Sequence, residues 1–128
     1  MISILTSKES VSKEIGVLAM SRDVFKELGE PILFDEGDRF FVSEKNGVLI
    51  GFSAMTEKGV LKYAYIMPGD RGRGLFSKIY ELIEDWAMSQ GIKTIKAVST
   101  NAGLPVYLKK GFVITHSFTN YHKVEKHL

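Results

Sequence analysis

Three glycines within six residues, followed at once by a long amphipathic pattern, limit the folds open to this sequence. Residues 68–77 read PGDRGRGLFS. Apolar residues then recur at helical spacing, at Leu75, Ile79, Leu82, Ile83 and Trp86. Gly91 stands where such a helix would end. The stretch predicts a tight loop that opens a long helix with one apolar face.

Three antiparallel strands are predicted before this loop. Residues 39–45 (RFFVSEK) and 48–56 (VLIGFSAMT) flank Asn46-Gly47, a pair that favours the two-residue turn of a β-hairpin. A third strand, residues 60–67 (VLKYAYIM), follows a turn at Lys58-Gly59. The glycine loop therefore begins where an antiparallel strand ends.

The N-terminal part of the chain predicts a short strand at residues 2–5 and then two helices. Thr6 and Glu9 have the spacing of a capping box, which predicts the start of the first helix. A second helix over residues 21–28 would end at Gly29, ahead of Pro31.

The C-terminal part continues with a strand at residues 93–99 (KTIKAVS), a short helix at 104–110, and strands at 112–118 and 121–126. A strand, helix, strand succession around the long helix implies a parallel crossover. The sequence thus predicts an α/β (α+β) fold with a mixed, mostly antiparallel sheet of seven strands and four helices.

Composition narrows the class of protein. With 128 residues, 45% hydrophobic and 25% charged, the sequence is typical of a single soluble domain, residues 1–128. The lack of cysteine excludes disulfides and thiolate catalysis and is consistent with a cytoplasmic location. The N-terminus predicts neither a signal peptide nor a membrane span. The net charge of +2 is scattered, which makes nucleic acid an unlikely partner.

A glycine loop at a helix start presents unpaired N–H groups and the positive end of the helix dipole, which attract phosphate. Arg71 and Arg73 add positive charge. The loop lacks the G-K-[S/T] of a Walker A motif, and no third glycine completes a dinucleotide fingerprint. Two solvated arginines in a flexible turn are the alternative interpretation.

Two segments carry a family resemblance. Residues 66–87 (IMPGDRGRGLFSKIYELIEDWA) contain Arg71-x-x-Gly74 ahead of an amphipathic helix and resemble motif A of the GNAT superfamily of acetyl-CoA-dependent N-acetyltransferases. Residues 100–112 (TNAGLPVYLKKGF) resemble its motif B, in which a tyrosine stands four residues before a Gly-Phe pair. The resemblance implies a GNAT fold whose fourth and fifth strands splay apart.

The same resemblance implies the site residues. Acetyl-CoA would be the acetyl donor, with no metal, and Tyr107 the general acid, although packing beneath the last strands is the alternative for this tyrosine. A backbone N–H near Ile66 would hold the oxyanion. The implied cofactor-binding residues are Ala64, Tyr65, Ile66, Arg71, Gly72, Arg73, Gly74, Leu75, Phe76, Ser77 and Asn101.

Two positions depart from the family pattern. Phe76 stands where the family has glycine or alanine, and its ring would either turn into the core or cap the site. Val60 occupies the place of a strand-four carboxylate, which leaves the general base open. The candidates are Glu57, Tyr63, Tyr65 and His116. The acidic segment 30–38 is either a solvated loop or an attractor of a cationic amine.

The predicted function is transfer of an acetyl group from acetyl-CoA to a primary amine, by direct attack in a ternary complex. A GNAT-fold protein that binds CoA without turnover is the alternative. A nucleic-acid contact through the DRGRG stretch is the least favoured. The acceptor, a small molecule or a peptide or protein amine, is not identified by the sequence, and homodimerisation is left open.

Overall fold

The computed structural model describes residues 2–128, and these form seven strands, four α-helices and one short 3-10 helix. In chain order the elements are β1 (Ile2–Leu5), α1 (Lys8–Ala19), α2 (Arg22–Leu28), β2 (Arg39–Lys45), β3 (Val48–Met55), β4 (Leu61–Ile66), η1 (Pro68–Asp70), α3 (Leu75–Ser89), β5 (Thr94–Thr100), α4 (Leu104–Lys109), β6 (Val113–Ser117) and β7 (Tyr121–His127). The predicted order of strands and helices is confirmed.

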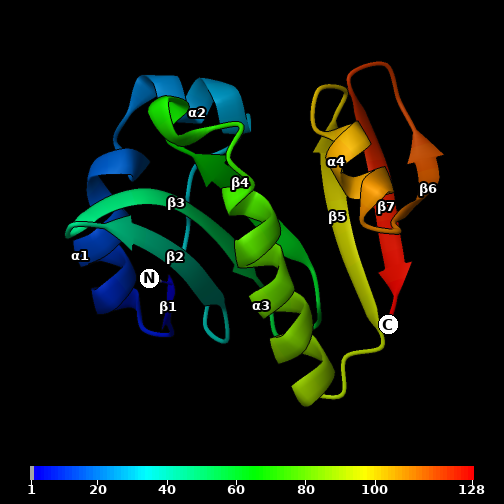
Figure 1. The fold of residues 1–128 in the computed structure, drawn as a ribbon, viewed down its shortest axis with the longest axis horizontal. Helices are drawn as coiled ribbons and strands as arrows, with labels where there is room; N and C mark the ends of the chain where they lie inside the picture. Colours follow the sequence, from blue (N-terminus) through cyan, green and yellow to red (C-terminus); the bar gives the residue numbers. More distant parts are fainter. Residues whose placement is uncertain (1) are drawn as a thin grey trace.

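The strands form two antiparallel sheets that meet at one end. One sheet has the order β1-β2-β3-β4 and the other the order β5-β7-β6. A parallel bridge between Val60 and Lys96 joins them, and the Lys96 N–H donates to the Gly59 carbonyl at 2.9 Å. Beyond this bridge β4 and β5 run apart (Figure 1). The predicted splay between the fourth and fifth strands is therefore present, and it leaves one flank of β4 without a strand partner.

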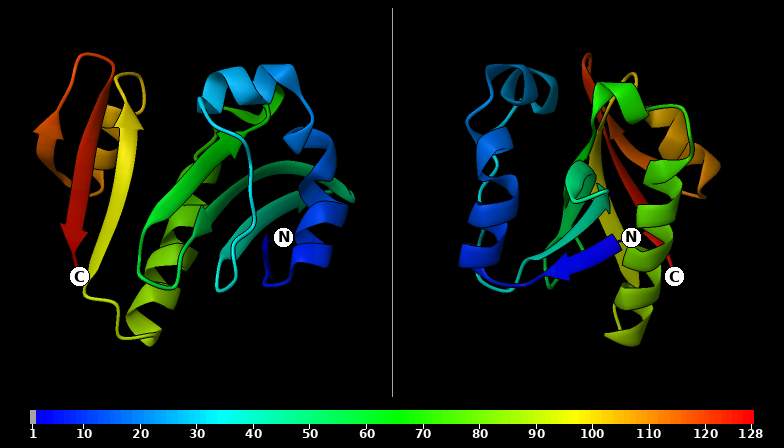
Figure 2. Two further views of the ribbon diagram at one scale, coloured as in Figure 1. Left: turned by 180° about the vertical axis from the view of Figure 1, so that it is seen from behind. Right: turned by 60° about the vertical axis from the view of Figure 1, so that its left-hand side comes forward.

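Helices cover both faces of the larger sheet. Helices α1 and α2 lie on one face and α3 on the other, while α4 lies beside β5 and β7 (Figures 1 and 2). Side chains alternate across a strand, so the neighbours Phe40 and Phe41 of β2 point into different cores. Both rings are fully buried. One strand thus anchors the packing on both sides of the sheet.

Local turn chemistry agrees with the sequence at most places. Asn46 and Gly47 adopt φ angles of 53° and 76°, as the hairpin turn requires, and Gly29 ends α2 in a left-handed conformation. The expected capping box is wrong by one residue. Ser7, rather than Thr6, caps α1, because its extended backbone lets its hydroxyl accept from the Ser10 N–H at 3.1 Å.

Strands β3 and β4 are each one residue shorter at their shared turn than the sequence predicts. Thr56 and Val60 close this turn instead of continuing the ladder. The Thr56 N–H donates to the Val60 carbonyl at 2.9 Å, and the Thr56 hydroxyl accepts from the Val60 N–H at 3.1 Å. The residues of the turn therefore hold the near end of β4 close to the bridge with β5.

Candidate active site

The loop between β4 and α3 has the backbone that its glycines predict. Gly72 and Gly74 adopt φ angles of 78° and 74°, which lie in the left-handed region that favours glycine. A Cβ at either position would meet nothing within 4 Å. The need for glycine there comes from the backbone conformation, and the space beside the loop is open.

The start of α3 lacks the side-chain cap that the first two helices have. Ser7 and Ser21 cap α1 and α2, whereas Gly74 gives α3 no side-chain cap, and its first turn holds no acidic residue. The first N–H groups of a helix have no partner within the helix and carry its positive dipole end. The loop therefore presents a helix start whose charge and donors suit an anion.

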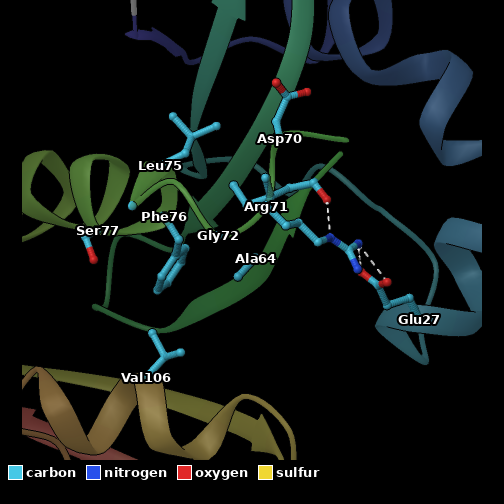
Figure 3. Close-up of a pocket in the computed structure, with 11 residues that line it drawn as sticks. Glu27, Ala64, Asp70, Arg71, Gly72, Leu75, Phe76, Ser77 and Val106 are labelled. Carbon is cyan, nitrogen blue, oxygen red and sulfur yellow. Dashed lines mark hydrogen bonds and ion pairs between the residues drawn. The ribbon is translucent and has the colours of Figure 1, made fainter. Parts of the chain in front are cut away.

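A cavity of about 340 Å³ lies against this loop (Figure 3). Strand β4, the loop, the first turn of α3, helix α2 and helix α4 all contribute to it. Its lining residues are Glu27, Ala64, Ile66, Asp70, Arg71, Gly72, Gly74, Leu75, Phe76, Ser77 and Val106. Most of the predicted cofactor-binding residues are thus brought together; Tyr65, Arg73 and Asn101 are not part of the lining.

Arg71 lies in the cavity wall but is held by protein groups. Its Nε donates to the Ile66 carbonyl at 2.8 Å, and one Nη donates to both carboxylate oxygens of Glu27 at 2.7 and 2.8 Å (Figure 3). Its guanidinium carbon also lies 5.4 Å from the centre of the Tyr65 ring. Arg71 therefore fastens the loop to the end of β4 and to α2.

The three predicted residues outside the lining have other surroundings. The Tyr65 ring is buried in the core beneath α1 and α2, where it packs on Phe52. Arg73 is exposed. Asn101 donates to the Thr119 carbonyl at 3.0 Å, and its side-chain oxygen lies 2.6 Å from Nε2 of His122. The Asn101 side chain thus ties the end of β5 to the β6–β7 connection.

Tyr107 lies beneath the cavity rather than in its lining. Its ring meets those of Phe76 and Phe112 edge to face, with centroids 6.1 and 5.2 Å apart. Only 9% of the residue is exposed, and burial raises the pKa of its phenol to about 12. Its neighbour Val106 is the α4 residue that faces the cavity. The phenol is therefore protonated at neutral pH and sheltered from solvent.

Phe76 belongs to both the core and the cavity. Its ring packs against Tyr107 and, at 6.3 Å between centroids, against Tyr80, while the residue also lines the cavity. The two orientations that the sequence left open are therefore combined, because one face of the ring is packed and the residue still borders open space.

Phe76→Ala is expected to lower the free energy of unfolding by about 3 kcal/mol, since truncation of a packed aromatic ring removes contacts and leaves a void. Urea unfolding followed by circular dichroism measures this loss. The control is Leu82→Ala on the same helix. Leu82 is 40% exposed, so its truncation should lower the free energy of unfolding by about 1 kcal/mol or less. Equal midpoints for Phe76→Ala and the parent would contradict the core packing of the ring.

None of the four candidate bases is among the residues that line the cavity. Tyr63 is structural, because its hydroxyl accepts from the Leu33 N–H at 2.9 Å and lies 3.1 Å from the Pro31 carbonyl. Glu57 is exposed in the β3–β4 turn, and His116 is exposed on β6. The carboxylates that do line the cavity are those of Glu27 and Asp70, which sequence reasoning missed.

The acidic segment before β2 is partly neutralised within the protein. Lys62 is the extra residue of a β-bulge in β4, and its Nζ lies 2.6 Å from the buried Asp38 carboxylate and 3.0 Å from that of Asp35. Burial acts to lower the pKa of Lys62, but hydrogen bonds to the two aspartates outweigh it, and the pKa is raised. The single charge of Lys62 thus offsets one of these two carboxylates, and the buried Asp38 is held within the protein.

Two kinds of feature are missing from the part of the chain that the structure describes. No group of three or more His, Cys, Asp or Glu side chains is arranged to hold a metal ion. None of the helices in residues 2–128 has both the length and the apolar run that a bilayer crossing needs.

Solved structures of acetyltransferases are similar to this fold along its whole length. PaiA N-acetyltransferase from Thermoplasma acidophilum, in complex with coenzyme A, has a TM-score of 0.75 and 14% identity, covering 100% of this chain and 99% of that one. ElaA from Escherichia coli has a TM-score of 0.78 and 14% identity, with 98% and 99% covered. A GNAT family acetyltransferase from Elizabethkingia anophelis with acetyl-CoA bound has a TM-score of 0.71 and 14% identity, with 100% and 97% covered.

These identities are low, so the likeness to solved structures concerns the fold. No curated protein matches the chain by sequence. The profile of the acetyltransferase (GNAT) domain, however, matches residues 7–125, which include β4, the glycine loop, α3, β5 and α4. A match of that extent, on a chain with this splayed sheet, means that the protein belongs to the GNAT family of acetyltransferases.

Proposed function

We propose that the protein transfers an acetyl group from acetyl-CoA to a primary amine, with both substrates bound at once. The observation that carries this proposal is the uncapped start of α3 behind the Gly72–Gly74 loop, placed beside the unpaired flank of β4. The similar structures from T. acidophilum and E. anophelis, which hold coenzyme A and acetyl-CoA, support the choice of donor.

The residues present fit two adjoining parts of such a donor, its diphosphate and its pantetheine arm. The N–H groups of residues 72–77 would hold the diphosphate, since they combine unpaired donors with the helix dipole. The backbone of Ala64, Tyr65 and Ile66 would hold the pantetheine arm in the manner of an added strand. The two proposed binding segments are adjacent, because β4 leads into the loop, as the diphosphate adjoins the pantetheine arm in the donor.

The proposed chemistry is an acyl transfer. When bound, acetyl-CoA supplies the activated acetyl group, so the amine nitrogen bonds to the acetyl carbon as the carbon–sulfur bond breaks and the amine loses a proton. The Ile66 N–H is the proposed donor to the developing oxyanion. Tyr107 is the proposed donor of the proton that the sulfur takes, since its phenol, with a pKa of about 12, stays protonated near neutral pH.

A second candidate function is binding of CoA without turnover. Phe76, where the family has a small residue, and the absence of the four candidate bases from the cavity lining favour it. A cytoplasmic location is proposed for either function from the cysteine-free sequence alone.

Calorimetry with acetyl-CoA, followed by an amine panel assayed for free thiol and acetylated product by mass spectrometry, separates these functions. Binding with thiol release that depends on an amine supports the transferase. Binding without amine-dependent release supports the second function. No binding would refute both.

Glu27→Gln is expected to raise the affinity for acetyl-CoA about three- to tenfold, because it removes a negative charge from the cavity and releases Arg71 to face the diphosphate. The ion pair is roughly half exposed, so its loss should cost little stability. Calorimetry measures the gain, with Glu30→Gln, outside the lining, as the control. Weaker binding by Glu27→Gln, with unchanged binding by Glu30→Gln, would contradict the proposed repulsion between the Glu27 carboxylate and the diphosphate.

A further inference from the structure

Lys110 reaches from the end of α4 to the start of α3. Its Nζ donates to the Ser77 hydroxyl at 2.7 Å, and Ser77 is a lining residue in the first turn of α3. The ammonium lies 5.8 Å from the centre of the Phe76 ring and 5.2 Å from that of Tyr80. A positive charge from another part of the chain is thus held at the helix start that borders the cavity.

Lys110 has no ion-pair partner among the described residues, unlike Lys62 and Lys126, which are also partly buried. Arg71 pairs with Glu27, and Lys126, on the same Tyr80 ring, pairs with Glu84 at 2.9 Å. Within residues 2–128, Lys110 makes no ion pair. Among the described residues beside the loop, Lys110 and the exposed Arg73 therefore have no ion-pair partner, whereas Arg71 has one.

The surroundings of Lys110 disfavour a cation unless an anion is added. Burial lowers the pKa of its ammonium, and the carboxylates of Glu81 and Glu84 do not restore it. The adjacent helix start carries the positive end of the α3 dipole, which repels a second positive charge. An anion at the loop would relieve both effects, since it would meet the helix N–H groups and the ammonium together.

We propose that Lys110 is a specificity-determining residue of the donor site: its ammonium, held by Ser77, pairs with the diphosphate of acetyl-CoA. This inference rests on the proposed function. Ser77 connects the ammonium to the cavity, because its hydroxyl accepts from Lys110 while the residue borders the cavity. An ammonium has three donors, so two remain for phosphate oxygens.

Calorimetry on the full chain tests the assignment, with coenzyme A and 3′-dephospho-coenzyme A as probes. Lys110→Met keeps most of the aliphatic side chain and removes the charge, and it should weaken coenzyme A binding about 10- to 100-fold. Lys110→Arg should stay within about fivefold of the parent, since it retains the charge. The control is Lys109→Met, at the adjacent exposed lysine, which should change affinity by about threefold or less.

The two probes distinguish the phosphates. If Lys110 meets the diphosphate, Lys110→Met weakens binding of both probes by the same factor. A loss seen with coenzyme A but not with the 3′-dephospho form would overturn the assignment in favour of the 3′-phosphate. Unchanged affinity in a Lys110→Met protein with a parental melting temperature would overturn it outright. A parent chain that binds neither probe would overturn the proposed function, and this assignment with it.

Discussion

Tyr107→Phe is expected to lower kcat by about 10²- to 10⁴-fold, the usual contribution of a general acid. The substitution deletes one hydroxyl and keeps the ring, so the contacts with Phe76 and Phe112 remain. The affinity for acetyl-CoA should change little, because the Tyr107 hydroxyl is not among the groups proposed to hold the donor. Steady-state kinetics with an accepted amine, alongside a melting curve, measures both effects.

The control for this substitution is Tyr121→Phe, the same deletion at a tyrosine on β7 that is 41% exposed. It should leave kcat within a few-fold of the parent. A near-parental kcat for a stably folded Tyr107→Phe protein would remove Tyr107 from the mechanism. The tyrosine would then serve packing alone, the alternative that the sequence left open.

Lys62→Met is expected to lower the free energy of unfolding by about 3–5 kcal/mol, because it leaves the Asp38 carboxylate charged and buried without its partner. Asp38 is 1% exposed, and its Oδ2 also accepts from the Asp35 N–H at 2.9 Å. Urea unfolding measures the loss. Lys58→Met in the exposed β3–β4 turn is the matched control and should cost about 0.5 kcal/mol or less.

The stability that the Lys62–Asp38 pair contributes also depends on pH, and it should fall at alkaline pH. The folded-state pKa of Lys62 is raised above the ordinary value of 10.5. The stability that the pair contributes is therefore fully present below that ordinary value and is lost as the pH rises through the folded-state value. The parent and Lys62→Met should accordingly become more alike in stability at strongly alkaline pH. A difference in unfolding free energy between the two proteins that stays constant through that pH range would contradict the raised pKa of Lys62.

The fold was largely predictable because its signals are local. The turn at Asn46-Gly47, the stop at Gly29 and the apolar face of α3 each depend on residues that are neighbours in sequence. The cap of α1 was misplaced by one residue for a related reason. Thr6 and Ser7 carry the same kind of hydroxyl, and the backbone conformation of Ser7 decides between them.

The side-chain contacts of the site were less predictable, because they join distant parts of the chain. Arg71 and Glu27 are 44 positions apart, and Lys110 and Ser77 are 33 apart. No periodic pattern encodes such a pair, so Glu27 was not foreseen and both loop arginines were treated alike. The burial of Tyr107 likewise depends on the rings of Phe76 and Phe112 that pack against it. The spacing of residues along α4 does not reveal these contacts.

The unpaired flank of β4 makes donor binding visible at single amides by hydrogen–deuterium exchange. In an antiparallel ladder alternate N–H groups point to opposite sides, so half of the β4 amides bond to β3 and the others face the splay. We expect the second set to exchange with solvent in the free protein. A pantetheine arm lying along Ala64–Ile66 would slow exchange at the outward amides only, in an alternating pattern of protection that loop tightening or general stabilisation does not produce.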